Sequence, residues 1–371
     1  MTVADKLAKS GPRKLLALDG GGIRGLLTIE VLAEIERRLR EEAGDEELVL
    51  ADYFDYIGGT STGAIIATCL SLGMPVEKIR DFYVQNAQTM FEKSSLLKRY
   101  RFKYEDDRLA NRLKQELGTD TTLGSDKLRT LLLIVMRNAT TDSPWPLSNN
   151  PAARYNAPDR TFSNLEIPLW QLVRASTAAP TFFPPEVIDI GGGQHFVFVD
   201  GGVTMYNNPA FQLFLMATLE PYRLCWPTGA EQMLLVSIGT GTAARANENL
   251  EPGEMNLVYN ATSIPSALVA AALHEQDILC RVFGRCLLGD PIDRELGDLL
   301  VGKGLVEPKL FTYVRYNAEL TEEGLAAMNL SQIRPRDVQR LDSIEHVAEL
   351  QQVAKAVAAK VDLQHFAGFP A

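Results

Sequence analysis

The fold is decided by Lys14-Leu15-Leu16-Ala17-Leu18-Asp19-Gly20-Gly21-Gly22 and by residues 53–63, which end in Gly59-Thr60-Ser61-Thr62-Gly63. Each stretch starts with a short apolar run, typical of a buried strand, and passes into a glycine-rich turn. A helical pattern follows each turn, because apolar residues recur at helical spacing over 26–43 and residues 64–71 are apolar on all sides. Strand, glycine turn and helix thus occur twice in succession, which predicts an α/β fold with a mainly parallel sheet.

Composition and charge exclude several classes of protein. The 371 residues are 46% hydrophobic and 23% charged, as in an ordinary globular protein. The 37 Lys and Arg residues against 47 Asp and Glu give a net charge of −10. This balance argues against nucleic-acid binding and against long-range attraction to an anionic membrane. Residues 1–13 are polar and unlike a signal peptide, and no apolar run has the length of a membrane span. The four cysteines are too scattered for a disulfide scaffold, so we expect a cytoplasmic location.

The rest of the chain is organised as one domain. Residues 131–137 form a strong strand pattern, and residues 142–159 contain four prolines, which predicts an exposed loop. A further strand ends in Asp200-Gly201-Gly202, and the pattern beyond Pro265 is mainly helical. We therefore predict a core over residues 14–241 and a mainly helical C-terminal region over residues 242–371, packed on the same domain.

The strongest chemical signal is Gly59-x-Ser61-x-Gly63 between a predicted strand and a predicted helix. A nucleophilic serine sits on a sharp turn at a helix N-terminus, and the flanking glycines give that turn the steric freedom it needs. The alternative is an ordinary glycine-rich turn in which the serine caps the helix.

A second signal, Gly20-x-Gly22-x-x-Gly25, has two interpretations. It matches the dinucleotide-binding fingerprint, but the next predicted strand ends in the serine turn and not in the acidic residue that binds ribose. Alternatively, the backbone N–H groups of this loop form an oxyanion hole for acyl transfer. A nucleophile and an oxyanion hole on adjacent turns would make one coherent site.

A serine nucleophile needs a base, and two candidates stand out. His274 would complete the order Ser61, Asp200, His274 of an α/β-hydrolase, but it lies within a helical run and Ser61 comes early for that fold. Asp200 ends an apolar strand, so its carboxylate is expected at the same sheet edge as Ser61, within reach of the hydroxyl. The alternative for Asp200, as for Asp19, is a turn aspartate that caps its own backbone.

Taken together, the motifs resemble the patatin-like phospholipase family over residues 14–241. The residues that carry the resemblance are those of five segments: Asp19-Gly20-Gly21-Gly22-Ile23-Arg24-Gly25, Gly59-Thr60-Ser61-Thr62-Gly63, Ala175-Ser176-Thr177-Ala178-Ala179-Pro180-Thr181-Phe182-Phe183-Pro184, Asp200-Gly201-Gly202 and Ser237-Ile238-Gly239-Thr240-Gly241. All stand in the family's order. Residues 242–371 are not explained by the resemblance.

The resemblance implies a three-layer patatin-like sandwich with a Ser–Asp dyad at the C-terminal strand edge. Ser61 would be the nucleophile and Asp200 the base, with Gly59 and Gly63 at the nucleophile turn and Gly201 and Gly202 at the turn that supports the aspartate. The implied oxyanion hole comprises Gly20, Gly21, Gly22, Arg24 and Gly25, with Arg24 holding the loop. The implied reaction is phospholipase A-type hydrolysis of fatty acyl esters in phospholipids or other glycerolipids, without a metal or other cofactor.

Partners follow from this expectation. The substrate would be a membrane lipid, and the basic cluster Lys98, Arg99, Arg101 and Lys103 is a candidate for transient contact with the membrane surface. Some soluble bacterial members of the family are activated by cyclic nucleotides in phage defence, so an activator of this kind is a further hypothesis. Two rival hypotheses stay open: a nucleotide-binding protein that uses the loop from Gly20 to Gly25, and an α/β-hydrolase that uses His274.

Overall fold

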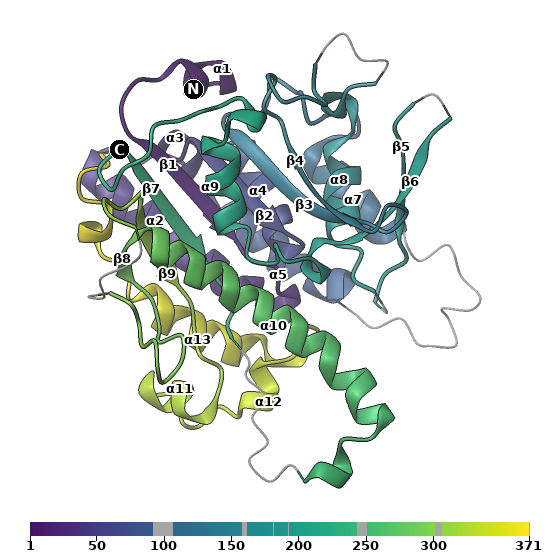
Figure 1. Cartoon of the computed structure of the whole chain (residues 1–371), viewed down its shortest axis with the longest axis vertical. Coiled ribbons are helices and arrows are strands. Elements are labelled where there is room, and N and C mark those ends of the chain that lie inside the picture. Colours follow the sequence, from purple (N-terminus) through teal and green to yellow (C-terminus); the bar gives the residue numbers. More distant parts are fainter. Residues whose placement is uncertain are drawn as a thin grey trace.

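The computed structural model describes residues 1–91, 107–157, 162–180, 182–191, 193–242, 251–300 and 306–370. Within these residues the chain builds a sheet with the strand order β5-β6-β3-β2-β1-β7-β9-β8, and β4 pairs with β3 beside this path. Figure 1 shows the sheet with helices packed on both faces. The predicted α/β fold with a mainly parallel sheet is confirmed. The basic cluster Lys98, Arg99, Arg101 and Lys103 lies outside the described residues.

Most of the strands run parallel to one another. The parallel strands are β1 (Arg13–Leu18), β2 (Tyr56–Thr60), β3 (Leu131–Asn138), β7 (Met233–Ile238), β8 (Arg285–Leu288) and β9 (Thr312–Tyr316). The antiparallel strands lie on the β3 side of the sheet and are β4 (Ser143–Ser148), β5 (Glu186–Asp189) and β6 (His195–Asp200).

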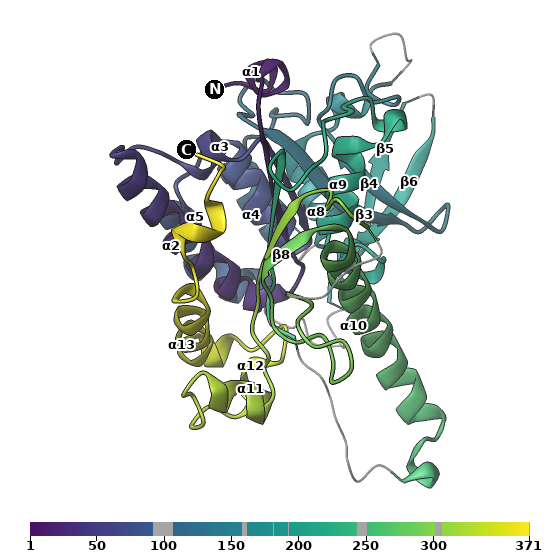
Figure 2. The ribbon, with the colours of Figure 1, turned by 60° about the vertical axis from the view of Figure 1, so that its left-hand side comes forward.

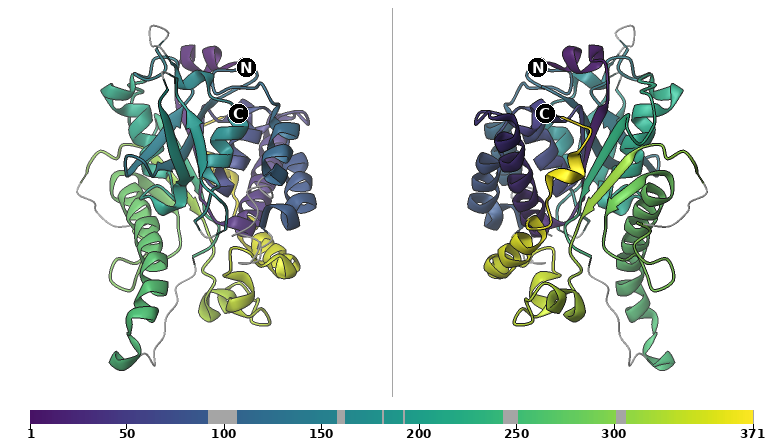
Figure 3. Two further views of the ribbon diagram at one scale, coloured as in Figure 1. Left: turned by 90° about the vertical axis from the view of Figure 1, so that its right-hand side faces the viewer. Right: turned by 90° about the vertical axis from the view of Figure 1, so that its left-hand side faces the viewer.

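Helices cover both faces of the sheet, as the two side views in Figure 3 show. One face carries α2 (Gly25–Ala43), α4 (Thr62–Ser71), α5 (Val76–Phe91), α7 (Asp107–Leu117), α8 (Leu169–Ser176) and α13 (Val347–Ala358). The other face carries α9 (Ala210–Thr218) and α10 (Leu257–Phe283). Short helices complete the fold: α1 (Val3–Ala8), α3 (Leu50–Tyr53), α11 (Glu322–Ala327) and α12 (Pro335–Val338). None of the helices described is both long enough and apolar enough to cross a bilayer.

The core forms because side chains of the central strands alternate between the two helical layers. In β1, Leu16 and Leu18 pack into the cluster with α2 and α4, while Leu15 and Ala17 pack into the cluster with α9. All four are fully buried. Such burial on both faces explains why residues 15–18 of β1 form a continuous apolar run and do not alternate with polar residues.

The structure differs from the predicted elements at three places. Tyr53 belongs to the short helix α3, and the second strand begins only at Tyr56. The proline-rich segment predicted as a loop contains β4. The C-terminal region is helical in large part but also contributes β8 and β9 to the same sheet. These two strands are short, and charged residues such as Arg315 interrupt their apolar pattern.

Candidate active site

Ser61 lies on a sharp turn between β2 and α4. Its backbone φ of +54° is unusual for a residue other than glycine, and such strained geometry is found where function demands it. The turn packs very tightly, because a Cβ added to Gly63 would lie 2.2 Å from the Leu18 carbonyl oxygen, and one added to Gly59 would lie 2.1 Å from that of Gly63. Gly63 is therefore needed for the turn to fit against the end of β1, and Gly59 for the strand to pack against the first turn of α4.

The strand register brings Asp200 to Ser61. Strand β2 pairs with one edge of β3, and its last residue, Thr60, lies opposite Val135. The antiparallel β6 pairs with the next stretch of the same edge, where Asp200 lies opposite Met136. Asp200 therefore arrives where β2 ends. The Ser61 hydroxyl donates a hydrogen bond to Asp200 Oδ2 across 2.6 Å.

The backbone of the nucleophile turn is held by a residue of α8. The Ser61 N–H donates to Ser176 Oγ across 2.9 Å, and the Ser176 hydroxyl in turn donates to the Val135 carbonyl across 2.6 Å. Ser176 thus joins the turn to the central strand β3. The sequence analysis assigned it no role, although it lies in one of the segments that resemble the family.

The carboxylate of Asp200 is buried yet has hydrogen-bond partners on both oxygens. Asp200 is 5% exposed, and its Oδ1 accepts from the Gly202 N–H across 2.6 Å. Burial raises the pKa of Asp200 to about 6, while the hydrogen bonds from Ser61 and Gly202 oppose that rise. A carboxylate with such a pKa is a stronger base than an exposed aspartate and is still largely ionised at neutral pH.

The glycine loop after β1 lies directly against the nucleophile. A Cβ added to Gly20 would lie 3.2 Å from Cβ of Ser61 and 2.3 Å from the Asn207 amide oxygen, so a larger residue would displace Asn207. The Gly20 N–H itself donates to the Asn207 carbonyl. Within the described chain, the N–H groups of Gly21 and Gly22 have no hydrogen-bond acceptor. These two N–H groups are therefore free to bind an anion.

The remaining N–H groups of the predicted oxyanion hole are engaged in the loop itself. The Arg24 N–H donates to the Gly21 carbonyl, and the Gly25 N–H donates to the carbonyls of Gly22 and Ile23. The Arg24 side chain is buried, and its positive charge favours the ionised form of Asp19.

Side chains from distant parts of the chain fix the loop in place. The Thr240 hydroxyl donates to the Gly20 carbonyl and the Thr62 hydroxyl donates to the Gly22 carbonyl, each across 2.9 Å. Arg315 of β9 makes two hydrogen bonds, of 2.9 and 2.6 Å, to the carboxylate of Asp19, which directly precedes the loop. Burial raises the pKa of Asp19, and Arg315 opposes that rise. Asp19 therefore serves as an anchor of the loop, and Arg315 is a residue that the sequence analysis missed.

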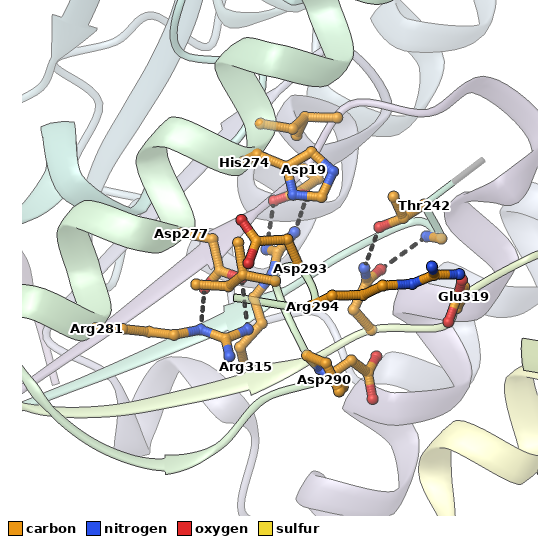
Figure 4. A pocket seen from close by; sticks show the side chains of 15 residues that line it. Asp19, Thr242, His274, Asp277, Arg281, Asp290, Asp293, Arg294, Arg315 and Glu319 are labelled. Carbon is orange, nitrogen blue, oxygen red and sulfur yellow. Dashed lines mark hydrogen bonds and ion pairs between the residues drawn. The ribbon is translucent and has the colours of Figure 1, made fainter. Parts of the chain in front are cut away.

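His274 lies apart from Ser61 and Asp200. It lines a cavity of about 410 Å³ between α10 and the chain around residues 290–294, together with Asp19 and Arg315, as Figure 4 shows. Neither Ser61 nor Asp200 lines this cavity. All four histidines belong to the described part of the chain, and none of them is hydrogen-bonded to Ser61 or Asp200.

Charged side chains dominate the walls of this cavity. Five carboxylates outnumber three guanidinium groups, and the side chains concerned are Asp19, Asp277, Asp290, Asp293, Glu319, Arg281, Arg294 and Arg315. Among the residues described, no group of three or more His, Cys, Asp or Glu side chains is placed to hold a metal ion.

Comparison with known proteins extends these observations. A family model described as "Patatin-like phospholipase" matches residues 16–214. Patatin-T5 of Solanum tuberosum is 30% identical over 246 residues, which cover 62% of this chain and 61% of that protein. A "cGAMP-activated phospholipase" of Vibrio cholerae is 32% identical over 212 residues, which cover 53% of this chain and 56% of that protein. Patatin-like protein 1 of Arabidopsis thaliana is 29% identical over 330 residues, 74% of this chain and 75% of that protein. The chain thus matches only about three fifths of the length of the first two relatives.

Proposed function

Because the chain belongs to the patatin-like phospholipase family, we propose that it is a lipid acyl hydrolase that cleaves fatty acyl esters of phospholipids or other glycerolipids with Ser61 and Asp200. The observation that carries this proposal is the 2.6 Å hydrogen bond from the Ser61 hydroxyl to the buried carboxylate of Asp200. It supports a dyad in which the aspartate itself is the base.

In the first half of the proposed reaction, Asp200 accepts the hydroxyl proton while Ser61 Oγ attacks the acyl carbonyl carbon. The carbonyl oxygen becomes an oxyanion, and the N–H groups of Gly21 and Gly22, which have no acceptor in the described chain, are the proposed donors that stabilise it. The ester bond then breaks, the alcohol part of the lipid takes the proton from Asp200, and the fatty acid remains bound to Ser61 as an ester.

In the second half, Asp200 acts again as a base. It takes a proton from water, whose oxygen attacks the acyl ester of Ser61, and the same N–H groups stabilise the second oxyanion. When the intermediate collapses, the Ser61 oxygen recovers the proton from Asp200 and the free fatty acid leaves. Each half of the cycle returns Asp200 to its ionised state, so the aspartate alone carries the proton.

Fatty-acid release from mixed phospholipid vesicles tests the proposed function. The wild-type protein should release fatty acid, and Ser61→Ala should lower the rate by roughly a thousandfold or more, since removal of a nucleophile leaves only the weak contribution of the remaining site. His274→Ala should retain the wild-type rate. Loss of activity in His274→Ala would favour the α/β-hydrolase hypothesis. Binding of a dinucleotide by a wild-type protein that does not hydrolyse lipid would favour the nucleotide-binding hypothesis.

We further propose that the hydrolase is switched on by a cyclic nucleotide. The support is the relative from Vibrio cholerae, which is described as a cGAMP-activated phospholipase and aligns with this chain at 32% identity. The test is vesicle hydrolysis with and without cyclic dinucleotides, with Ser61→Ala as the control for contaminating lipase. A wild-type rate that no cyclic dinucleotide changes would contradict this part of the proposal.

A further inference from the structure

Helix α10 extends well beyond the body of the molecule, as Figure 2 shows. Its first half exposes large apolar side chains to solvent. Leu257 is 84% exposed, Leu268 is 65% exposed and Ile264 is 50% exposed. Exposed apolar side chains gathered on one element mark an interaction surface and need an explanation.

The exposed half of α10 lies at the same edge of the sheet as the nucleophile, the edge at which the parallel strands end. The helix leads into β8, which runs parallel to its neighbour β9, so α10 itself runs back from the C-terminal edge of the sheet to the N-terminal edge. His274 lines a cavity with Asp19 and Thr242, which follow the C-terminal ends of β1 and β7. Residues 257–273 therefore extend past this edge, by about 24 Å at 1.5 Å per residue. Ser61 follows β2 at the same edge.

The protruding half of the helix is free of charge. Residues 255–273 contain no acidic, basic or histidine side chain, whereas the whole chain carries a net charge of −10. The charges of α10 begin at Glu275 and Asp277, where the helix packs on the body of the protein, and the exposed Glu251 and Glu254 precede the helix. An uncharged, apolar segment is the part of an acidic protein that can approach a lipid surface without electrostatic repulsion.

The length and composition of the exposed apolar stripe argue against a second helix as the partner. Five of the exposed apolar residues, Leu257, Ala261, Ile264, Leu268 and Ala271, are separated by four and three residues in turn, and the exposed Pro265 and Ala267 lie beside them. A coiled coil uses this spacing, but it needs three to four heptads and flanking charges that fix the pairing. This stripe spans two heptads, two of its five residues are alanine, and its flanks carry no charge.

We propose that residues 257–273 of α10 form a membrane-docking helix that inserts its apolar side into the surface of a neutral, zwitterionic bilayer. The inference rests on the proposed function, since docking there brings the edge of the sheet that carries Ser61 toward the lipid. The helix lacks the lysines and arginines that attract interfacial helices to anionic lipids. Binding should therefore depend on apolar burial and should change little with salt concentration or with anionic lipid content.

Vesicles of ether-linked phosphatidylcholine test the proposal, because they contain no acyl ester and report binding whether or not the protein is a hydrolase. The measurement is the fraction of protein that sediments with the vesicles at increasing lipid concentration. Leu257→Ser combined with Leu268→Ser should weaken partitioning roughly a hundredfold, since burial of one leucine contributes about a tenfold effect or more.

The matched control is Leu219→Ser. Leu219 is 45% exposed and follows α9 at the opposite, N-terminal edge of the sheet. There the Trp226 N–H donates to the Ala217 carbonyl, and the Trp226 ring contacts Arg13, the first residue of β1. This control should bind as the wild type does. The double variant should hydrolyse a water-soluble ester at the wild-type rate, which would show that it is folded and has lost only docking. If neither protein hydrolyses this ester, the proposed function fails, while the sedimentation measurement still tests docking.

Three kinds of result would overturn the proposal. The first is a failure of the sedimentation assay to depend on the two leucines: either the double variant sediments like the wild type, or the wild type itself does not sediment. The second is binding that requires anionic lipid and disappears at high salt. The third is a wild-type dimer, measured by light scattering, that becomes a monomer in the double variant, because the stripe would then contact a second copy of the chain.

Discussion

Asp200 has to be ionised to accept the proton of Ser61, so the protonation of one buried carboxylate should govern the pH dependence of hydrolysis. Burial raises the pKa of Asp200 from 3.8 to about 6. Below pH 6 the carboxylate is protonated and inactive as a base, and above pH 6 it is ionised. We therefore expect kcat/KM on a soluble ester to rise tenfold per pH unit below 6 and to level off above it. A rise centred near pH 4 would show that burial does not control this group.

The two residues of the proposed dyad could be predicted from the sequence because each stands at the end of a short apolar strand with a glycine one or two positions beyond it. Those glycines are needed for close packing, as at Gly63, so they leave a visible trace in the sequence. Arg315 leaves no such trace. It reaches Asp19 from 296 positions away, and a lone arginine in a short strand gives no hint of its partner.

Strand β9 is the element that holds the glycine loop, because it carries Arg315 to Asp19. Both side chains are buried, and an uncompensated buried charge is costly. Arg315→Met should therefore lower the free energy of unfolding by roughly 3–5 kcal/mol, measured by urea denaturation. The double variant Asp19→Asn with Arg315→Met removes both charges and should recover a large part of this loss. Equal destabilisation in the single and double variants would contradict the anchoring role.

Strand β4 shows why a propensity argument misses an edge strand. Its prolines Pro144 and Pro146 suggested a loop, yet both positions pair with β3, opposite Arg137 and Val135. Residues two apart in a strand direct their N–H positions to the same edge. The ring nitrogens of both prolines, which carry no N–H, can therefore face the outer edge, where β4 has no neighbour among the described strands and needs no donor.

At the scale of the whole molecule, the C-terminal region completes the sheet that carries Ser61 and the glycine loop. Strand β9 pairs with β7 along its length, and α13 packs on α2. A protein truncated after Gly241 would lose β9 with Arg315, the partner of Asp19, and would lose α13, which covers α2. We expect this truncated chain to show no cooperative thermal unfolding, measured by circular dichroism. A cooperative transition together with esterase activity would show that residues 14–241 fold and work alone.

The extent of the sheet could not be predicted from local patterns, because β8 and β9 are stabilised by their neighbours. The segment Thr312–Tyr316 is fully or nearly fully buried although it contains Arg315, whose charge is neutralised by Asp19. Only the folded chain brings these two side chains together. The nucleophile turn, in contrast, depends on residues within a few positions of Ser61.

The central claim is that Ser61 is activated by Asp200 without a histidine, and covalent labelling tests it most directly. A lipid-like fluorophosphonate is incubated with the wild type, with Asp200→Asn and with His274→Ala, and the labelled residue is found by peptide mass spectrometry. We predict a label on Ser61 in the wild type and at the same rate in His274→Ala, and a strongly reduced rate in Asp200→Asn. A label on another residue, or labelling that depends on His274 and not on Asp200, would contradict the account.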